Sequence, residues 1–159
     1  MKMRKNNKLF NIKHKSGLKS KYLMSRNDLN LDHIAYAVKS TDKAIKGFKY
    51  IYPYVKVYKK IEKKQNVYIS CLFNGNDTHY LELVEPMAGH SPVSNLIKEK
   101  ESVLYHVGYR TDNFEKVVKI MKKNGYFMIT EPFKPSFDNA KWACHFFMPE
   151  TGAIEVIGS

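Results

Sequence analysis

The sequence is poor in cysteine and has no long hydrophobic run. Two cysteines among 159 residues cannot build a disulfide framework, so a reducing, cytoplasmic setting is expected. No apolar stretch approaches the roughly 18 residues that cross a bilayer, which predicts a soluble protein without a membrane partner. Acidic residues are also scarce, because 15 Asp and Glu stand against 27 Lys and Arg, a net charge of +12.

The excess of positive charge is concentrated near the N-terminus. Residues 1–30 contain nine basic residues and one acid, a net charge of +8, which leaves +4 for the rest of the chain. This segment has neither helical nor strand periodicity and lacks the apolar centre of a secretory signal, so we expect a disordered or loosely docked basic extension. A solvated extension is one interpretation, and an arm for nucleic acid or another anionic surface is the alternative. For the body of the chain no nucleic-acid partner is predicted.

The remainder of the chain contains an internal repeat. A gapless shift of 73 positions aligns LDHIAYAV, residues 31–38, with LYHVGYRT, residues 104–111. The same shift aligns Glu82 in YLELVEP with Glu155 in AIEVIGS, so each copy has a Glu 49 positions after its His. Residues 31–86 and 104–157 are therefore predicted to be two copies of one module. Further identical pairs are Leu31 and Leu104, His33 and His106, Tyr36 and Tyr109, Cys71 and Cys144, and Phe73 and Phe146.

Each module is predicted to be a strand, a helix and three further strands. The first helix is expected to begin at a Ser40 or Thr41 cap and to end before Pro53, burying Ala44, Ile45, Phe48 and Ile51. The second is expected to begin at Thr111 or Asp112 and to end at the Asn124-Gly125 turn. The following strands are expected around 54–61, 66–73 and 78–84, and around 126–131, 140–148 and 152–157. Ser91 and Pro92 indicate a short helix between the modules.

Small residues accompany both histidines of the repeat. Alternate residues of a strand share a face, so His33 is expected beside Leu31 and Ala35, with Asp32 on the opposite face. By the same rule His106 is expected beside Gly108. These small neighbours are predicted to leave room above the sheet.

The repeat changes the interpretation of its His and Glu residues. A lone strand His is usually a packed core residue, and a lone Glu is usually solvated. Two modules related by a pseudo-twofold axis would instead bring two His and two Glu to one centre. Imidazole and carboxylate ligands with open positions suit a divalent transition metal such as Co, Ni, Zn, Mn or Fe(II).

These motifs resemble the vicinal oxygen chelate superfamily, which includes glyoxalases, bleomycin resistance proteins and dioxygenases. The resemblance covers residues 31–157 and rests on LDHIAYAV, YLELVEPMAGHSPVSNLIKEK, LYHVGYRTDNFEKVVKIMKKNG and MPETGAIEVI. Methylmalonyl-CoA epimerases are the most similar group, and glyoxalase I is the second. The resemblance implies one α+β domain in which two βαβββ modules pair into a cup-shaped open barrel. It also implies metal ligation by His33, Glu82, His106 and Glu155.

The activity implied by the resemblance is proton exchange at a carbon alpha to a thioester or other carbonyl. The enzyme would be a metal-dependent epimerase or isomerase with a small-molecule substrate such as a CoA thioester, methylmalonyl-CoA being the default. Glu155 is the first candidate for the base, and Glu82 is its symmetric partner on the opposite face. The alternatives are a glyoxalase I-type lactoylglutathione lyase and a non-catalytic ligand-binding or resistance protein of the same fold. A homodimer is compatible with either enzyme.

The third strand of the first module departs from the epimerase pattern. Some epimerases carry an additional glutamate there, whereas NVYISCLF contains no acid, so a second base is not assigned and Tyr68 or Ser70 could assist. We interpret Cys71 and Cys144 as core residues. Among the histidines without a repeat partner, His79, His90 and His145, we expect His145 to lie nearest the substrate.

Overall fold

The fold repeats one βαβββ unit twice. The computed structural model describes residues 24–25, 28–75, 79–135 and 140–159. The first unit comprises β1 (Asn30–Val38), α1 (Thr41–Phe48), β2 (Lys56–Glu62), β3 (Val67–Phe73) and β4 (Tyr80–Pro86). The second comprises β5 (Ser102–Thr111), α2 (Phe114–Lys123), β6 (Phe127–Met128), β7 (Trp142–Met148) and β8 (Gly152–Gly158). The predicted α+β pair of modules is confirmed.

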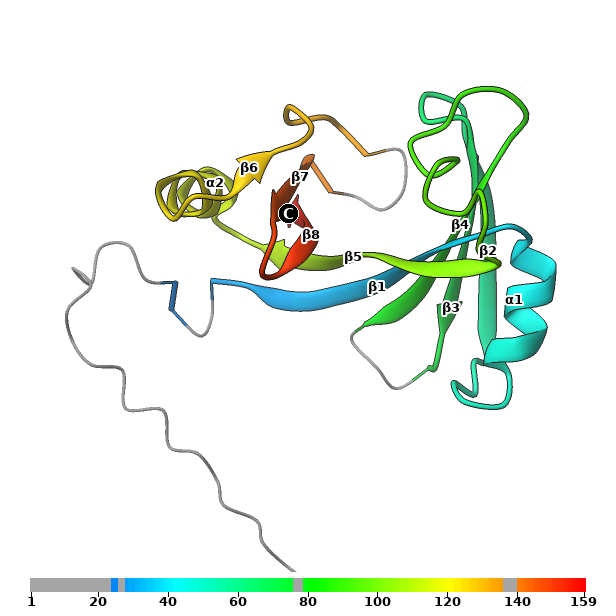
Figure 1. Ribbon diagram of the computed structural model, residues 1–159. Helices are drawn as coiled ribbons and strands as arrows, with labels where there is room; N and C mark the ends of the chain where they lie inside the picture. Colours follow the sequence, from blue (N-terminus) through cyan, green and yellow to red (C-terminus); the bar gives the residue numbers. More distant parts are fainter. Residues whose placement is uncertain (1–23, 26–27, 76–78, 136–139) are drawn as a thin grey trace, which may run out of the picture.

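All the described strands belong to one mixed sheet in the order β2-β3-β4-β1-β5-β8-β7-β6. From either edge inwards, the strands come in the same order within their module: second, third, fourth and first. Each module therefore places its first strand at the centre of the sheet and its second strand at the edge. Figure 1 shows β1 and β5 side by side across the middle, with α1 beside the first half and α2 beside the second. The edge strands β2 and β6 do not pair with each other, so the sheet is open, as the glyoxalase-like fold predicts.

The central strands pair in the register that a twofold axis requires. β1 and β5 are antiparallel, with His33 opposite Gly108 and Ala35 opposite His106. Each of these strands then pairs in parallel with the last strand of its own module, β4 or β8. Residues that are 73 positions apart in the sequence therefore occupy equivalent places around the centre of the sheet.

β1 departs from strict alternation at Asp32. Its pairing with β5 shifts register between Leu31 and His33, which is the pattern of a β-bulge. Asp32 and His33 are both buried, whereas Leu31 is exposed. The expectations that Leu31 shares a face with His33 and that Asp32 points away are wrong, because the bulge re-aims this part of the strand.

Each helix packs its apolar side against its own module. The Ser40 hydroxyl accepts a hydrogen bond from the Lys43 backbone N–H, as expected of an N-cap, and the buried contacts of α1 include Ala44, Ile45 and Phe48. Ile51 is 77% exposed, contrary to expectation, because α1 ends at Phe48. The N-cap of α2 is Asn113 rather than Thr111 or Asp112, and the Thr111 hydroxyl accepts from its backbone N–H. Val117 and Met121 of α2 pack on Cys144, Phe146 and Val156.

The segment between the modules and the strand β6 differ from the predictions. Residues 92–99 form consecutive turns in place of the expected helix, and their hydrogen bonds join residues three apart, such as the Leu96 N–H to the Val93 carbonyl. Val93 and Ile97 are buried, which anchors these turns on the core. β6 is shorter than expected because the N–H groups of Ile129 and Thr130 both converge on the His145 carbonyl.

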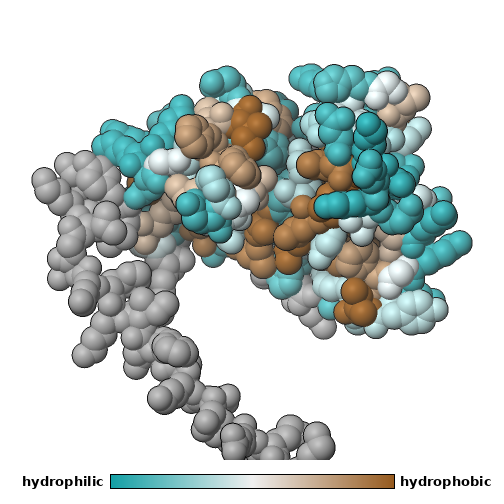
Figure 2. Space-filling view, viewed as in Figure 1, coloured by the Kyte–Doolittle hydropathy of each residue, from teal (hydrophilic) through white to brown (hydrophobic). Residues whose placement is uncertain are grey.

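The end of the basic N-terminal segment contacts the second module. Most of the predicted extension, residues 1–23 and 26–27, lies outside the described residues. Met24 and Leu29 pack against the α2 side of the core, and the Lys116 ammonium donates to Asp28 Oδ1 at 2.7 Å. No helix within the described ranges is long and apolar enough to cross a bilayer. Figure 2 shows hydrophilic residues over much of both halves, with hydrophobic residues gathered in the middle of this view.

Candidate metal centre

The two repeat histidines face each other at the centre of the sheet. His33 extends from β1 and His106 from β5, and their Nε2 atoms are 2.9 Å apart. Both side chains are buried, with their rings at 76° to each other. Gly108 makes this approach possible, because a Cβ at that position would lie 2.5 Å from His33 Nδ1 and 2.7 Å from His33 Nε2. The sequence predicted open room above Gly108, but the His33 ring occupies that space.

The two repeat glutamates reach the same point from the neighbouring strands. Glu82 pairs with Ala35 across β4 and β1, and Glu155 pairs with Gly108 across β8 and β5. Glu155 Oε2 lies 3.3 Å from His33 Nε2 and 3.6 Å from His106 Nε2. Glu82 Oε2 lies 3.7 Å and 3.8 Å from the same two atoms. The structure therefore brings together all four residues that the sequence singled out.

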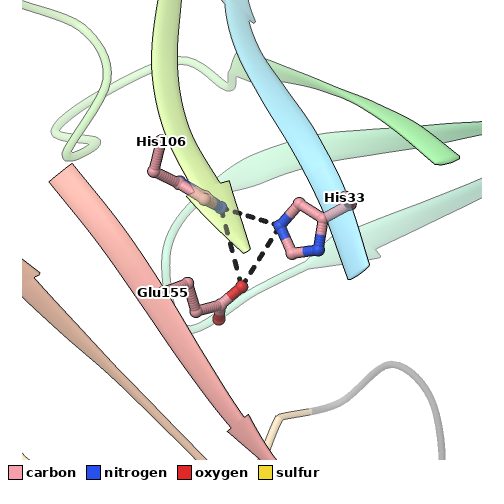
Figure 3. Close-up of side chains that lie close together, drawn as sticks. All are labelled: His33, His106 and Glu155. Atoms are coloured by element: carbon pink, nitrogen blue, oxygen red, sulfur yellow. Dashed lines mark hydrogen bonds and ion pairs between the residues drawn. The ribbon is translucent and has the colours of Figure 1, made fainter. Parts of the chain in front are cut away.

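The donor set fits a divalent metal ion. His33, His106 and Glu155 each offer a ligand atom within 4.8 Å of the others, as Figure 3 shows, and Glu82 approaches the same pair of nitrogens. Two imidazoles with carboxylates are the ligand types used for Zn, Co, Ni, Mn and Fe(II). Asp32 Oδ1 lies 2.9 Å from His33 Nδ1, so the hydrogen of that ring can point away from the centre and leave Nε2 as a ligand.

Mutual charges control protonation within the cluster. Burial disfavours the imidazolium of His33, but the negative charge of Glu82 and the hydrogen bonds to Asp32 and Glu155 outweigh it and raise the pKa of His33 to about 10. Burial would raise the pKa of Glu155, yet hydrogen bonds from His106 and His33 hold it well below its usual range. The buried cluster therefore contains an ion pair between His33 and Glu155.

The pKa values of Glu82, His106 and His145 shift in the direction that burial favours. Burial raises the pKa of Glu82, with the attraction of His33 opposing it. Burial lowers the pKa of His106 and of His145, which favours their neutral forms. The two repeat carboxylates thus have opposite pKa shifts although they occupy equivalent positions.

Sequence reasoning did not identify Asp32 and Arg110 as part of this site. Arg110 on β5 donates from Nε to Asp32 Oδ2 at 2.6 Å, while the other oxygen of Asp32 faces the His33 ring. The bulge in β1 creates this contact, and no residue pattern in LDHIAYAV reports a bulge. The adjacency of an Asp to the repeated His was the available signal.

His145 lies in the pocket, and its expected nearness to the reaction centre is consistent with its position. Its Nε2 is 3.7 Å from Glu155 Oε1, and its ring stacks on Phe133. The Thr130 hydroxyl is 3.1 Å from His145 Nδ1 and accepts from the His145 backbone N–H, which fixes the ring in place. Under the 73-residue shift the equivalent of His145 is Leu72, so this imidazole belongs to one half of the site only.

One pocket contains the whole cluster. Strands of both modules line this pocket. Besides the four repeat residues, the charged residues in its lining are Lys60, Glu62 and Arg110. Lys60 Nζ is 3.7 Å from Glu62 Oε2. The remaining lining residues are Gln65, Ile69, Tyr80, Val84, Tyr105, Phe133, Pro135, His145 and Ile157.

The other candidates from the sequence lie outside this pocket. Tyr68 and Ser70 do not line it, and neither do His79 and His90. Cys71 and Cys144 are buried, and burial raises the pKa of the Cys144 thiol to about 12, which suits packing rather than thiolate chemistry.

Comparison with known proteins gives a family and a set of similar folds. The sequence profile of the Glyoxalase/Bleomycin resistance protein/Dioxygenase superfamily matches residues 32–144. A hypothetical protein from Bacillus halodurans C-125 is 24% identical, with a TM-score of 0.69 over 82% of this chain and 94% of that one. Methylmalonyl-CoA epimerase from Mycobacterium tuberculosis is 15% identical, with a TM-score of 0.70 over 88% of this chain and 95% of that one.

A further similar structure carries a ligand. It is a methylmalonyl-CoA epimerase in complex with methylmalonyl-CoA and NH4+, 18% identical, with a TM-score of 0.67 over 83% of this chain and 95% of that one. At these identities the likeness establishes the fold. No curated protein matches the sequence.

Proposed function

The chain belongs to the Glyoxalase/Bleomycin resistance protein/Dioxygenase superfamily, and we propose that it is a metal-dependent epimerase or isomerase. The proposed reaction exchanges a proton at a carbon alpha to a thioester or other carbonyl. One observation carries the proposal: the buried Glu82 and the partly buried Glu155, one from each module, lie within 3.8 Å of the same pair of histidine nitrogens. Such a centre offers both ligands for a cation and groups that can carry a proton.

The ligands would be His33, His106, Glu82 and Glu155. A divalent ion held by them would act as a Lewis acid, stabilising the negative charge that develops on a carbonyl oxygen when the adjacent C–H bond is broken. The native ion belongs to the group of Co, Ni, Zn, Mn and Fe(II).

One carboxylate then accepts the proton, and the other delivers a proton. Glu155 accepts the alpha proton as the carboxylate base. Glu82, which reaches the centre from the other module, is the symmetric partner that delivers a proton to the opposite face. One C–H bond is broken and another is formed on the other face of the same carbon, so the configuration is inverted with no net gain or loss of protons.

The pocket wall supports an acyl substrate with an additional acidic group. Tyr80 stacks on His33, and Phe133 stacks on His145, so aromatic rings shield the centre from water. Lys60 and Arg110 add two cationic side chains to the same wall, where they pair with Glu62 and Asp32. A 2-methylmalonyl thioester, which has a free carboxylate beside the reacting carbon, matches this combination, and a similar epimerase structure holds methylmalonyl-CoA.

Hydrogen–deuterium exchange tests the proposal. Metal-loaded protein in heavy water should incorporate deuterium at the alpha carbon of methylmalonyl-CoA, and Glu155→Gln should slow this by about 100-fold or more, the usual contribution of an acid–base group. Glu101→Gln is the matched control, because Glu101 is an exposed acid that pairs with Lys39 far from the centre in the fold. Absence of deuterium incorporation by metal-loaded wild-type protein would refute the proposal.

A glyoxalase I-type lyase is the second candidate. It uses the same four ligands and also needs proton transfer beside a carbonyl. The observation that favours it is that β3, Val67–Phe73, carries no carboxylate for an additional base. Turnover of methylglyoxal with glutathione, in the absence of exchange on methylmalonyl-CoA, would select this activity.

A further inference from the structure

We propose that Asp32 and Arg110 form a positioning pair that holds His33 in the form that ligates a metal through Nε2. This inference rests on the metal centre of the proposed function. The contacts run in one chain, from Arg110 Nε to Asp32 Oδ2 at 2.6 Å and from Asp32 Oδ1 to His33 Nδ1 at 2.9 Å. His33 Nε2 then faces the centre, 3.3 Å from Glu155 Oε2.

The chemistry of the three groups fixes the orientation of the ring. An ionised carboxylate only accepts hydrogen bonds, and the Arg110 guanidinium only donates them. With one oxygen of Asp32 accepting from Arg110 and the other facing the ring, His33 Nδ1 has to carry a hydrogen. The lone pair of the ligating imidazole is consequently on Nε2, where the cluster needs it. The 2.6 Å contact with the Arg110 guanidinium is the ion pair expected of an ionised Asp32.

Burial makes the pair specific. Asp32 is 5% exposed, so its charge has little access to water and depends on its two neighbours. The bulge in β1 places both Asp32 and His33 on the buried side of the strand, which regular alternation would not allow. The bulge in β1 therefore helps to orient the His33 ring.

The second module has no equivalent of this pair. Under the 73-residue shift Asp32 corresponds to Tyr105, and His106 Nδ1 is a buried atom with no hydrogen-bond partner among the described residues. The pair is thus an addition to the repeated site, and it acts on His33 alone.

Replacing Asp32 by Asn provides a sharp test, because the amide has one acceptor where the carboxylate has two. Arg110 can only donate, so it takes the amide oxygen and turns the NH2 group toward His33. An NH2 group facing Nδ1–H is a clash of two donors, which opposes the ligating form of the ring. Asp32→Asn combined with Arg110→Met removes the competing donor, so the amide oxygen is free to accept from Nδ1.

The expected result is a rescue by the second substitution. With Co²⁺ as the probe, Asp32→Asn should weaken binding by about 10- to 100-fold, the usual effect of losing a hydrogen bond behind a metal ligand. Asp32→Asn with Arg110→Met should bind more tightly than Asp32→Asn alone. A purely structural role would make the double variant bind more weakly than Asp32→Asn alone, and that result would overturn the proposal, as would unchanged affinity in Asp32→Asn.

A matched control and a metal-free measurement complete the test. Asp28→Asn also removes a buried carboxylate that pairs with a basic side chain, Lys116, but this pair lies outside the site. The substitution should leave Co²⁺ affinity unchanged. In metal-free wild-type protein with ¹⁵N-labelled histidine, the His33 Nδ1 proton should be protected from exchange, lose protection in Asp32→Asn and regain it in the double variant. An Nδ1 proton that ignores these substitutions would overturn the pair even if the protein bound no metal. Loss of deuterium exchange activity, by contrast, would bear on the proposed function only.

Discussion

Gly108→Ala should disable the metal centre while leaving the fold in place. The added Cβ would lie 2.5 Å from His33 Nδ1 and 2.7 Å from His33 Nε2. Ordinary contacts begin near 3.5 Å, so the ring has to move by about 1 Å. It has little freedom to do so, because Asp32 binds one nitrogen, His106 faces the other and Tyr80 stacks on the ring.

The required movement is large compared with what a metal site tolerates. Metal–ligand distances are held to about 0.2 Å, so a shift of about 1 Å removes His33 as an effective ligand. We expect Co²⁺ affinity to fall by at least about 100-fold, beyond the upper range of an effect on an outer hydrogen bond. Overpacking should also cost about 1–3 kcal/mol of stability.

Competition with a chromophoric chelator measures the affinity, and a thermal melt followed by circular dichroism measures the stability. Gly158→Ala is the matched control, because its Cβ would lie 2.9 Å from the Phe114 Cβ, a comparable overlap away from the cluster. It should lower the melting temperature without changing Co²⁺ affinity. A folded Gly108→Ala protein that binds Co²⁺ as tightly as the wild type would refute the reasoning.

Two further predictions concern pH. Although burial opposes it, Glu82, Asp32 and Glu155 raise the pKa of His33 to about 10. Metal binding at pH 7.5 should therefore release about one proton, and the affinity should fall about tenfold for each unit by which the pH is lowered. Calorimetry in two buffers of different ionisation enthalpy measures the proton release, and binding heats that are independent of the buffer would contradict it. The hydrogen bond from Lys116 lowers the pKa of Asp28 below the unfolded value near 3.8, so this pair stabilises the fold above that pH and loses its effect as the pH falls through the folded pKa. Asp28→Asn should therefore flatten the dependence of the melting temperature on pH below about pH 4, and an unchanged profile would exclude the contribution.

The repeat made the centre of the fold predictable. A shift of 73 positions relates His33 to His106 and Glu82 to Glu155, and in the structure the same shift relates the register of β1 with β4 to that of β5 with β8. The pair of βαβββ modules and the convergence of the four residues follow from that one relation. They could be derived from one chain because alternation and helical periodicity are local properties of sequence.

The features that the sequence did not reveal depend on deviations from regular geometry. The bulge at Asp32 is a register change between β1 and β5, so it is decided by the partner strand rather than by local residue types. The turns at residues 92–99 lie where a helix was predicted, and the buried Val93 and Ile97 anchor them on the core. Tertiary contacts determine both outcomes.

The differences between the two halves matter for the chemistry as much as their similarity. In a strictly symmetric site Glu82 and Glu155 would have the same surroundings and the same pKa. Here burial raises the pKa of Glu82, whereas hydrogen bonds from both repeat histidines lower that of Glu155, and His145 adds a third imidazole beside Glu155 alone. Carboxylates whose environments separate their pKa values are the usual acid and base of a proton-transfer site. The residues that break the repeat therefore make the two carboxylates unequal, which is compatible with the proposed roles of Glu155 as the base and Glu82 as its partner.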